Sequence, residues 1–268
     1  MRAFTPLIVS VACACTPGPS QPTPDLAQTE AFGPERQLWG RVHDVADHNR
    51  GMPNVLLSTD RDETSTDLLG DYRIAASTSQ TRLFLHVEDT AWTPVVMHIP
   101  AYDEDTPMWS GLIPLEDTER MLSVVATTTN ISPTFRHDAA YVIVQVHLPN
   151  KIDRITIEHV DVRLHTPDDP LFPDAYYAQY NDALSTCLPV RGQGGVARAL
   201  PDCGGLTAFP EVPAGVEVEV EVEAFEGRLC ARSVQEAATG EGAPTARFRF
   251  VAEPGYLNVV NALCHNPT

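Results

Sequence analysis

The sequence predicts an all-β protein, built as two tandem antiparallel β-sandwiches. Apolar and polar residues alternate in short runs spaced about ten residues apart, and turn residues separate these runs. Proline (23 residues) outnumbers glycine (16), which is typical of many short strands joined by stiff turns. The length of 268 residues and a hydrophobic content of 43% suit one large or two small globular domains. Collagen, coiled coils and polytopic membrane proteins are therefore excluded.

The first fifteen residues have the features of an export signal. Arg2 supplies a positive charge, and the apolar run 3–12 is too short to span a bilayer, which needs ~20 residues. Cys13 and Cys15 each follow an alanine. This pattern resembles the lipobox of bacterial lipoproteins, which implies that one of the two thiols is acylated and anchors the protein in a membrane. The choice between the two thiols is open, and a plain signal peptide with chance cysteines is the alternative.

A disordered Pro/Ser/Thr tether is expected over residues 16–36. Four prolines within 17–24 favour extended polyproline II, so the segment is a semi-rigid spacer. A signal, an acylatable cysteine and a spacer in this order predict a lipoprotein of the bacterial cell envelope. No Asp follows either cysteine, and the lipoprotein resemblance then implies placement in the outer membrane.

The first sandwich is expected over residues 37–105. Its strands are predicted from period-two runs bounded by turn residues. These runs are Leu38–Asp44, Asn54–Thr59, Asp71–Ala76, Arg82–Glu88 and Pro94–Ile99.

Three ordered motifs within this segment carry a family resemblance. They are Gly40-Arg41-Val42-His43-Asp44, Gly51-Met52-Pro53-Asn54-Val55 and Thr66-Asp67 followed by Gly70-Asp71-Tyr72. In this order they resemble the carboxypeptidase regulatory-like domain, and the resemblance implies a transthyretin-like/Ig-like sandwich of seven strands. The chain has no H-E-x-x-H or H-x-x-E sequence, so the zinc peptidase that often accompanies this domain is not expected.

An acidic linker with a short helix is expected over residues 106–130. The helix is predicted at Thr118–Thr128, with Met121, Leu122 and Val125 on one side.

The second sandwich is expected over residues 131–268. Its predicted strands are Tyr141–His147, Arg154–Leu164, Val216–Ala224, Ala246–Val251 and Tyr256–Ala262. In the third of these, valine and glutamate alternate, which buries a Val face and exposes a Glu face that would repel a like strand edge. Residues 204–215 resemble a turn in the second half of the same family, and residues 165–205 are expected to form a long inserted loop. The alternative is one sandwich followed by an unrelated β domain.

Four cysteines lie beyond the proposed anchor, and an even number in an exported chain predicts two disulfides with three possible connectivities. Cys187–Cys203 and Cys230–Cys264 are favoured. No C-x-x-C pair is present, so zinc binding and thioredoxin-like chemistry are poorly supported.

The nine histidines raise the question of a metal site. His159 and Asp161 have the spacing of the iron-binding facial triad, and His265 could supply a third ligand. The same strand would equally give a solvated polar face opposite its valines, and this is the favoured interpretation. An acidic run around Asp60 and Asp62 could bind Ca²⁺, although it lacks the ligand spacing of an EF-hand. No cofactor is expected.

The net charge of −18 and the absence of a basic cluster make binding to nucleic acid unfavourable. No G-x-S-x-G elbow, P-loop or dinucleotide fingerprint occurs. We therefore expect a non-catalytic lipoprotein whose 165–205 segment, with Phe172 and several tyrosines, binds a protein or glycan partner. The alternatives are a metal-dependent envelope enzyme using His159 and Asp161, and a purely structural spacer.

Overall fold

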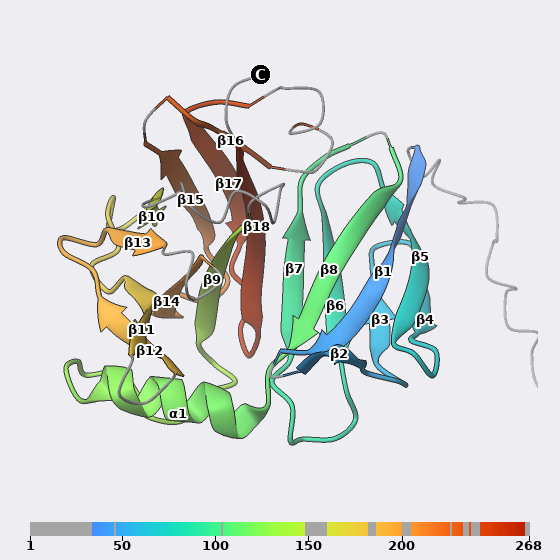
Figure 1. The fold of residues 1–268 in the computed structure, drawn as a ribbon, viewed down its shortest axis with the longest axis horizontal. Helices are drawn as coiled ribbons and strands as arrows, with labels where there is room; N and C mark the ends of the chain where they lie inside the picture. The colour runs from blue at the N-terminus through green and yellow to red at the C-terminus, as the bar shows by residue number, and fades with distance from the viewer. Residues whose placement is uncertain are drawn as a thin grey trace, which may run out of the picture. The chain divides into compact units, whose positions relative to one another are not determined.

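Strands dominate the computed structural model, which confirms the predicted all-β class (Figure 1). The structure describes residues 34–45, 47–102, 104–147, 160–181, 186–199, 205–225, 227–232, 236 and 242–265. The predicted signal and nearly all of the predicted tether lie outside these residues, and so do Cys13 and Cys15. No helix in the described part of the chain has the length and apolar character needed to cross a bilayer.

The first module, residues 35–126, contains eight strands and one helix. Their bounds are β1 (Glu35–Asp44), β2 (Asp47–Gly51), β3 (Leu56–Ser58), β4 (Glu63–Ser65), β5 (Asp71–Ser77), β6 (Thr81–His86), β7 (Val95–Ile99), β8 (Thr106–Leu112) and α1 (Leu115–Ala126). One sheet has the order β2-β1-β5, with β8 also paired to β1. Strands β7, β6, β3 and β4 form one end of a second, ten-stranded sheet.

The second module, residues 140–265, contains the remaining strands. They are β9 (Ala140–His147), β10 (Val160–His165), β11 (Tyr176–Asn181), β12 (Thr186–Arg191), β13 (Ala197–Ala199), β14 (Leu206–Val212), β15 (Glu217–Ala224), β16 (Leu229–Ala231), β17 (Thr245–Val251) and β18 (Leu257–His265). A four-stranded sheet has the order β13-β10-β15-β17. The other layer is the remainder of the ten-stranded sheet, in the order β12-β11-β14-β9-β18 with β16 beside β18.

The two modules are joined through β18, which pairs in parallel with both β7 and β9. Strand β8 also pairs in parallel with β1. The other pairs between the named strands are antiparallel as predicted, and these three are the exceptions. The alternating pattern of a strand indicates which face is buried, but it does not reveal the direction of a neighbour that comes from elsewhere in the chain.

Strand β9 contributes to both hydrophobic cores. Tyr141 and Ile143 pack in the core of the first module, whereas Val142 and Val144 pack in the core of the second. The same holds for β18, where Leu257 belongs to the first core and Val260, Ala262 and Cys264 belong to the second. Continuous apolar runs are typical of strands covered on both faces. We call β7, β18 and β9 the seam strands.

Residues 106–112 form a strand rather than part of the predicted linker. The backbone of β8 lies so close to β1 that a Cβ on Gly40 would come within 2.0 Å of the Met108 carbonyl oxygen. Glycine is required at such an approach because it has no Cβ. The acidic, proline-containing sequence around β8 does not read as a strand. Pro107 is compatible with a strand only at a sheet edge or a bulge, because proline cannot donate a backbone hydrogen bond.

The helix predicted after this segment is present and begins three residues earlier than expected. Its buried residues are Thr118, Leu122 and Val125, which lie on one face of the helix. The hydroxyls of Thr118 and Thr93 lie 2.8 Å apart in a buried hydrogen bond. This contact fixes the start of the helix against the loop before β7.

The predicted 165–205 loop contains three strands, β11, β12 and β13. Strands β11 and β12 form an antiparallel hairpin that extends the ten-stranded sheet, and β13 pairs with β10 in the opposite sheet. The hairpin was missed because Pro189 and many polar residues interrupt the apolar alternation. Pro189 is tolerated because β12 ends its sheet, where one side of the strand needs no hydrogen-bond donor.

The disulfide Cys230–Cys264 is confirmed, and it joins the paired strands β16 and β18. Cys187 is also disulfide-bonded. Its predicted partner, Cys203, lies outside the described residues, so that pairing remains a prediction.

Replacing both Cys230 and Cys264 by serine should lower the free energy of unfolding by about 3–4 kcal/mol, because the bond closes a loop of 34 residues in the unfolded chain. Urea unfolding followed by circular dichroism would measure the change. A loss below about 1 kcal/mol would show that the bond does not constrain the unfolded chain as expected.

Candidate functional site

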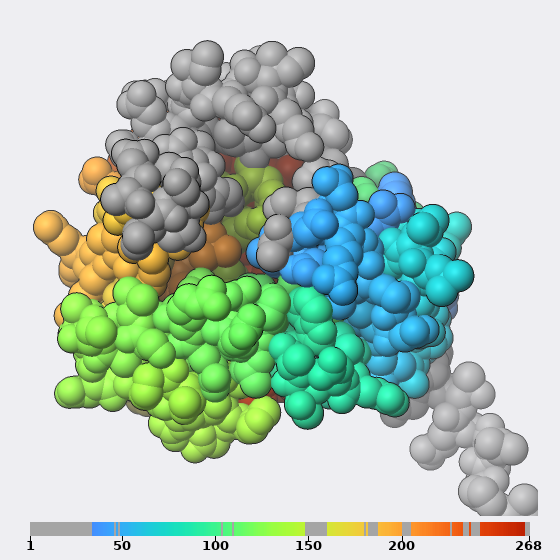
Figure 2. All heavy atoms as spheres, turned by 60° about the horizontal axis from the view of Figure 1, so that its bottom comes forward, coloured from blue at the N-terminus to red at the C-terminus, as the bar shows by residue number. Residues whose placement is uncertain are grey.

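An open groove of about 700 Å³ lies at the C-terminal end of α1. It is lined by residues 127–131, Phe172, Asp174, Arg191, Pro210 and Glu211. Residues from the helix end and from the second module therefore meet here, and Figure 2 shows the green segment around α1 against the yellow and orange strands of the second module. We call this space the helix-end groove.

Three consecutive threonines form the helix side of the groove. The hydroxyl of Thr127 donates to the Val124 carbonyl at 2.6 Å, and those of Thr128 and Thr129 donate to the Val125 carbonyl at 3.1 and 3.0 Å. The same two carbonyls also accept the backbone N–H groups of Thr127 and Thr128, so the hydroxyls add a second donor at the helix end. Each hydroxyl proton is thus donated within the protein, and the lone pairs of each hydroxyl oxygen can accept hydrogen bonds from a molecule in the groove.

A bulge in β14 forms the floor of the groove. The pairing of β14 with β9 shifts between Phe209 and Val212, because Pro210 has no N–H to donate to the ladder. Glu211 adopts a φ of 50°, which is costly for a residue with a side chain. Its carboxylate accepts from the Ser132 backbone N–H at 2.9 Å, and this bond holds the segment after α1.

The far wall consists of the start and end of the β11–β12 hairpin. Arg191 donates to the Asp174 carboxylate at 2.8 Å. The ring of Phe172 packs edge-on against Phe209 with its centroid 6.5 Å away, so the second core supports it from behind. The wall therefore presents an ion pair beside an aromatic side chain.

Basic side chains balance the two carboxylates of the groove. Arg136 lies 3.7 Å from Glu211 and also forms a two-point ion pair with Asp138, which lowers the pKa of Asp138 through hydrogen bonding. The Tyr141 hydroxyl accepts from the Arg136 N–H at 3.0 Å, and burial raises its pKa. With Arg191 on Asp174, these two arginines face the three carboxylates of Glu211, Asp138 and Asp174, which leaves a formal charge of −1.

The residues that the sequence predicted as iron ligands do not lie together in one sheet. Asp161 lies on β10 in the four-stranded sheet and binds Arg198 and Arg163 at 3.3 and 3.5 Å. His265 ends β18 in the ten-stranded sheet, and His159 lies outside the described residues. No group of three or more His, Cys, Asp or Glu side chains in the described ranges is arranged to hold a metal ion. The iron site remains a prediction.

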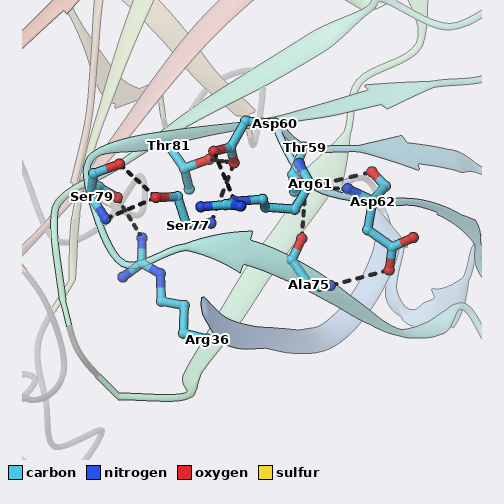
Figure 3. Close-up of polar contacts among 9 residues, drawn as sticks. All are labelled: Arg36, Thr59, Asp60, Arg61, Asp62, Ala75, Ser77, Ser79 and Thr81. Carbon is cyan, nitrogen blue, oxygen red and sulfur yellow. Dashed lines mark hydrogen bonds and ion pairs between the residues drawn. The ribbon is translucent and has the colours of Figure 1, made fainter. Parts of the chain in front are cut away.

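The acidic loop around Asp60 is fixed by internal hydrogen bonds (Figure 3). Asp60 accepts from the Thr81 hydroxyl at 2.6 Å and lies 3.7 Å from the Arg61 guanidinium. Asp62 accepts from the Ala75 N–H at 3.3 Å, and Thr59 donates to the Ala75 carbonyl at 2.6 Å. The carboxylates that suggested Ca²⁺ binding thus hold the β3–β4 loop against β5 and β6.

The glutamate face of β15 is covered with positive charge. The valines of this strand are buried as predicted, but β15 is a central strand between β10 and β17. Glu221 pairs with Arg247 at 2.8 Å, and Glu223 pairs with Arg163 at 2.7 Å. The expectation that these glutamates repel a like edge was therefore wrong, because basic residues on both neighbouring strands neutralise them.

A buried polar network crosses the seam strands. Asn258 on β18 is fully buried, and its amide oxygen lies 2.9 Å from Nε2 of His98 on β7 and accepts from the Glu253 N–H at 2.7 Å. Its amide nitrogen donates to the carbonyls of Glu253, Tyr256 and Tyr141. These bonds orient the amide so that its oxygen faces His98. Because an oxygen can only accept, Nε2 of His98 must carry the proton that it donates. Burial lowers the pKa of His98 to about 4.

Most of the groove could not be located from the sequence. The sequence marks Phe172 as a candidate for recognition, but it assigns no binding role to Glu211 or to the three threonines. Pro210 inside β14, with Pro213 directly after the strand, is the signal that could have indicated the bulge.

Neither a protein-family model nor a curated protein sequence matches the chain. Solved structures with some similarity include the shaft pilin of Lactobacillus rhamnosus GG (8% identity, TM-score 0.27, covering 88% of this chain and 98% of the pilin). A pilus-presented adhesin (8%, 0.32, covering 77% and 39%) and the Bacillus anthracis TIE protein (7%, 0.26, covering 86% and 33%) are also similar. The chain thus spans well under half the length of these last two. At these scores the likeness carries no argument about fold or function.

Proposed function

We propose that this protein is a non-catalytic binding module, tethered to the bacterial envelope through a lipid on Cys13 or Cys15. The N-terminal signal, the paired Ala-Cys steps and the proline-rich spacer support the tether. The resemblance of residues 37–105 to the carboxypeptidase regulatory-like domain supports a role without turnover. Outer-membrane placement is part of the same proposal.

The binding part of the proposal rests on the three seam strands. Strands β7, β18 and β9 are covered on both faces and joined by the Asn258 network, so both modules rest on one supported sheet. A supported strand frame holds a recognition surface in place, and here the frame carries the bulge and hairpin that line the helix-end groove.

Fractionation of cells that produce the full chain tests the tether. The native chain should be in the membrane fraction, and a Cys13→Ala/Cys15→Ala double variant should be soluble. Thr16→Ala, which leaves both thiols in place, is the matched control and should remain with the membrane. Mass spectrometry of the mature N-terminus should find an acylated cysteine, and an unmodified terminus would contradict the proposal.

A further inference from the structure

We infer that the helix-end groove binds a neutral oligosaccharide. The inference rests on the proposed binding function and names the class of ligand. The groove includes Phe172, Asp174 and Arg191 of the 165–205 segment, for which the sequence predicted a protein or glycan partner.

Hydrogen-bond acceptors predominate in the groove. The hydroxyls of Thr127, Thr128 and Thr129 donate inward to the helix and present their oxygens to the ligand. The carboxylates of Asp174 and Glu211 add further acceptors. A ligand that supplies many O–H donors satisfies this set, and a chain of sugar rings carries such donors on every unit.

The charge balance favours a neutral ligand. Arg191 lies on Asp174, and Arg136, whose closer partner is Asp138, lies 3.7 Å from Glu211, so each groove carboxylate has a cationic neighbour. An anionic ligand would meet the same carboxylates. Arg191 retains further N–H groups after one bond to Asp174, because a guanidinium carries five, and these can donate to a ring or hydroxyl oxygen.

The shape of the groove suits an extended ligand held against a fixed surface. Its volume of about 700 Å³ is within the range of small-ligand sites. Phe172 offers an apolar ring, supported by Phe209, against which the C–H face of a sugar can pack. The left-handed conformation of Glu211 is a local strain of the kind that persists at ligand sites when its surroundings enforce it.

The test uses the full chain in detergent on an array of neutral and acidic oligosaccharides, followed by calorimetry with the strongest neutral oligosaccharide found. We expect binding in the micromolar to millimolar range. Arg191→Ala should weaken it roughly tenfold, since it removes a charged hydrogen-bond donor. Asp174→Asn, which keeps the shape of the wall, should also weaken it.

Arg198→Ala is the matched control, because Arg198 is a half-exposed arginine of the same module that pairs with an aspartate away from the groove. It should bind like the native chain. Binding to no neutral oligosaccharide, binding to acidic ones alone, or binding unchanged by both groove variants would overturn the inference. The tether has a separate readout, so a membrane-bound chain without sugar binding would refute the groove inference alone.

Discussion

Asn258→Ala should lower the free energy of unfolding by about 3–4 kcal/mol, because it leaves several buried polar groups without partners. His98 would lose the acceptor of its Nε2–H, and the Glu253 N–H and several carbonyls would lose the amide. Since β18 pairs with strands of both modules, both should unfold at lower denaturant concentration. Urea unfolding with fluorescence and circular dichroism measures the shift.

Asn261→Ala is the matched control for this prediction. Asn261 lies three residues further along β18 and is partly buried, and its side chain forms a hydrogen bond with His147 at 3.2 Å. Its loss should lower the free energy of unfolding by about 1 kcal/mol. If both variants lowered the free energy of unfolding equally, the Asn258 network would stabilise the seam strands no more than an ordinary hydrogen bond.

The stability of the protein should fall as the pH drops from about 6.5 to about 4. Burial holds the pKa of His98 at about 4, whereas a histidine in the unfolded chain has its ordinary value near 6.5. Between these values the unfolded state binds a proton that the folded state does not, so the free energy of unfolding decreases with decreasing pH. The full contribution of His98 is about 3 kcal/mol. Burial also lowers the pKa of His147, which acts in the same direction.

His98→Gln separates the contribution of His98 from that of other groups. Glutamine can donate to Asn258 but does not titrate. Urea unfolding at pH 7 and pH 5 should therefore show a smaller loss of stability in the variant than in the native chain. Equal losses would place the pH dependence in other residues.

Local periodicity predicted much of the strand content. The alternation in 216–224 placed the valines of β15 inside, and the spacing of Leu122 and Val125 located α1 to within three residues. Export-type cysteine usage correctly suggested Cys230–Cys264. Each of these features depends on neighbours along the chain or on a simple count, so the sequence contains the information directly.

Contacts between distant segments could not be predicted in the same way. Nothing local in 106–112 indicates that β8 lies beside β1, and the pattern of β15 does not indicate that arginines of β10 and β17 will cover its glutamates. The helix-end groove combines a helix terminus, a hairpin and a bulge, whose lining residues 131 and 172 are 41 positions apart and 191 and 210 are 19 apart. Its acceptors meet only after the sheets have formed.

The amino-acid sequence by itself thus determined the all-strand character of the protein and the faces that its strands bury, and it favoured one of its disulfides without excluding the other connectivities. Only the tertiary structure decided that β18 joins both modules in a single sheet, and that Glu211, Arg191 and the threonines after α1 share one groove. The physical reason is that side-chain alternation is a property of each strand alone, whereas strand partners are selected by the packing of the whole chain.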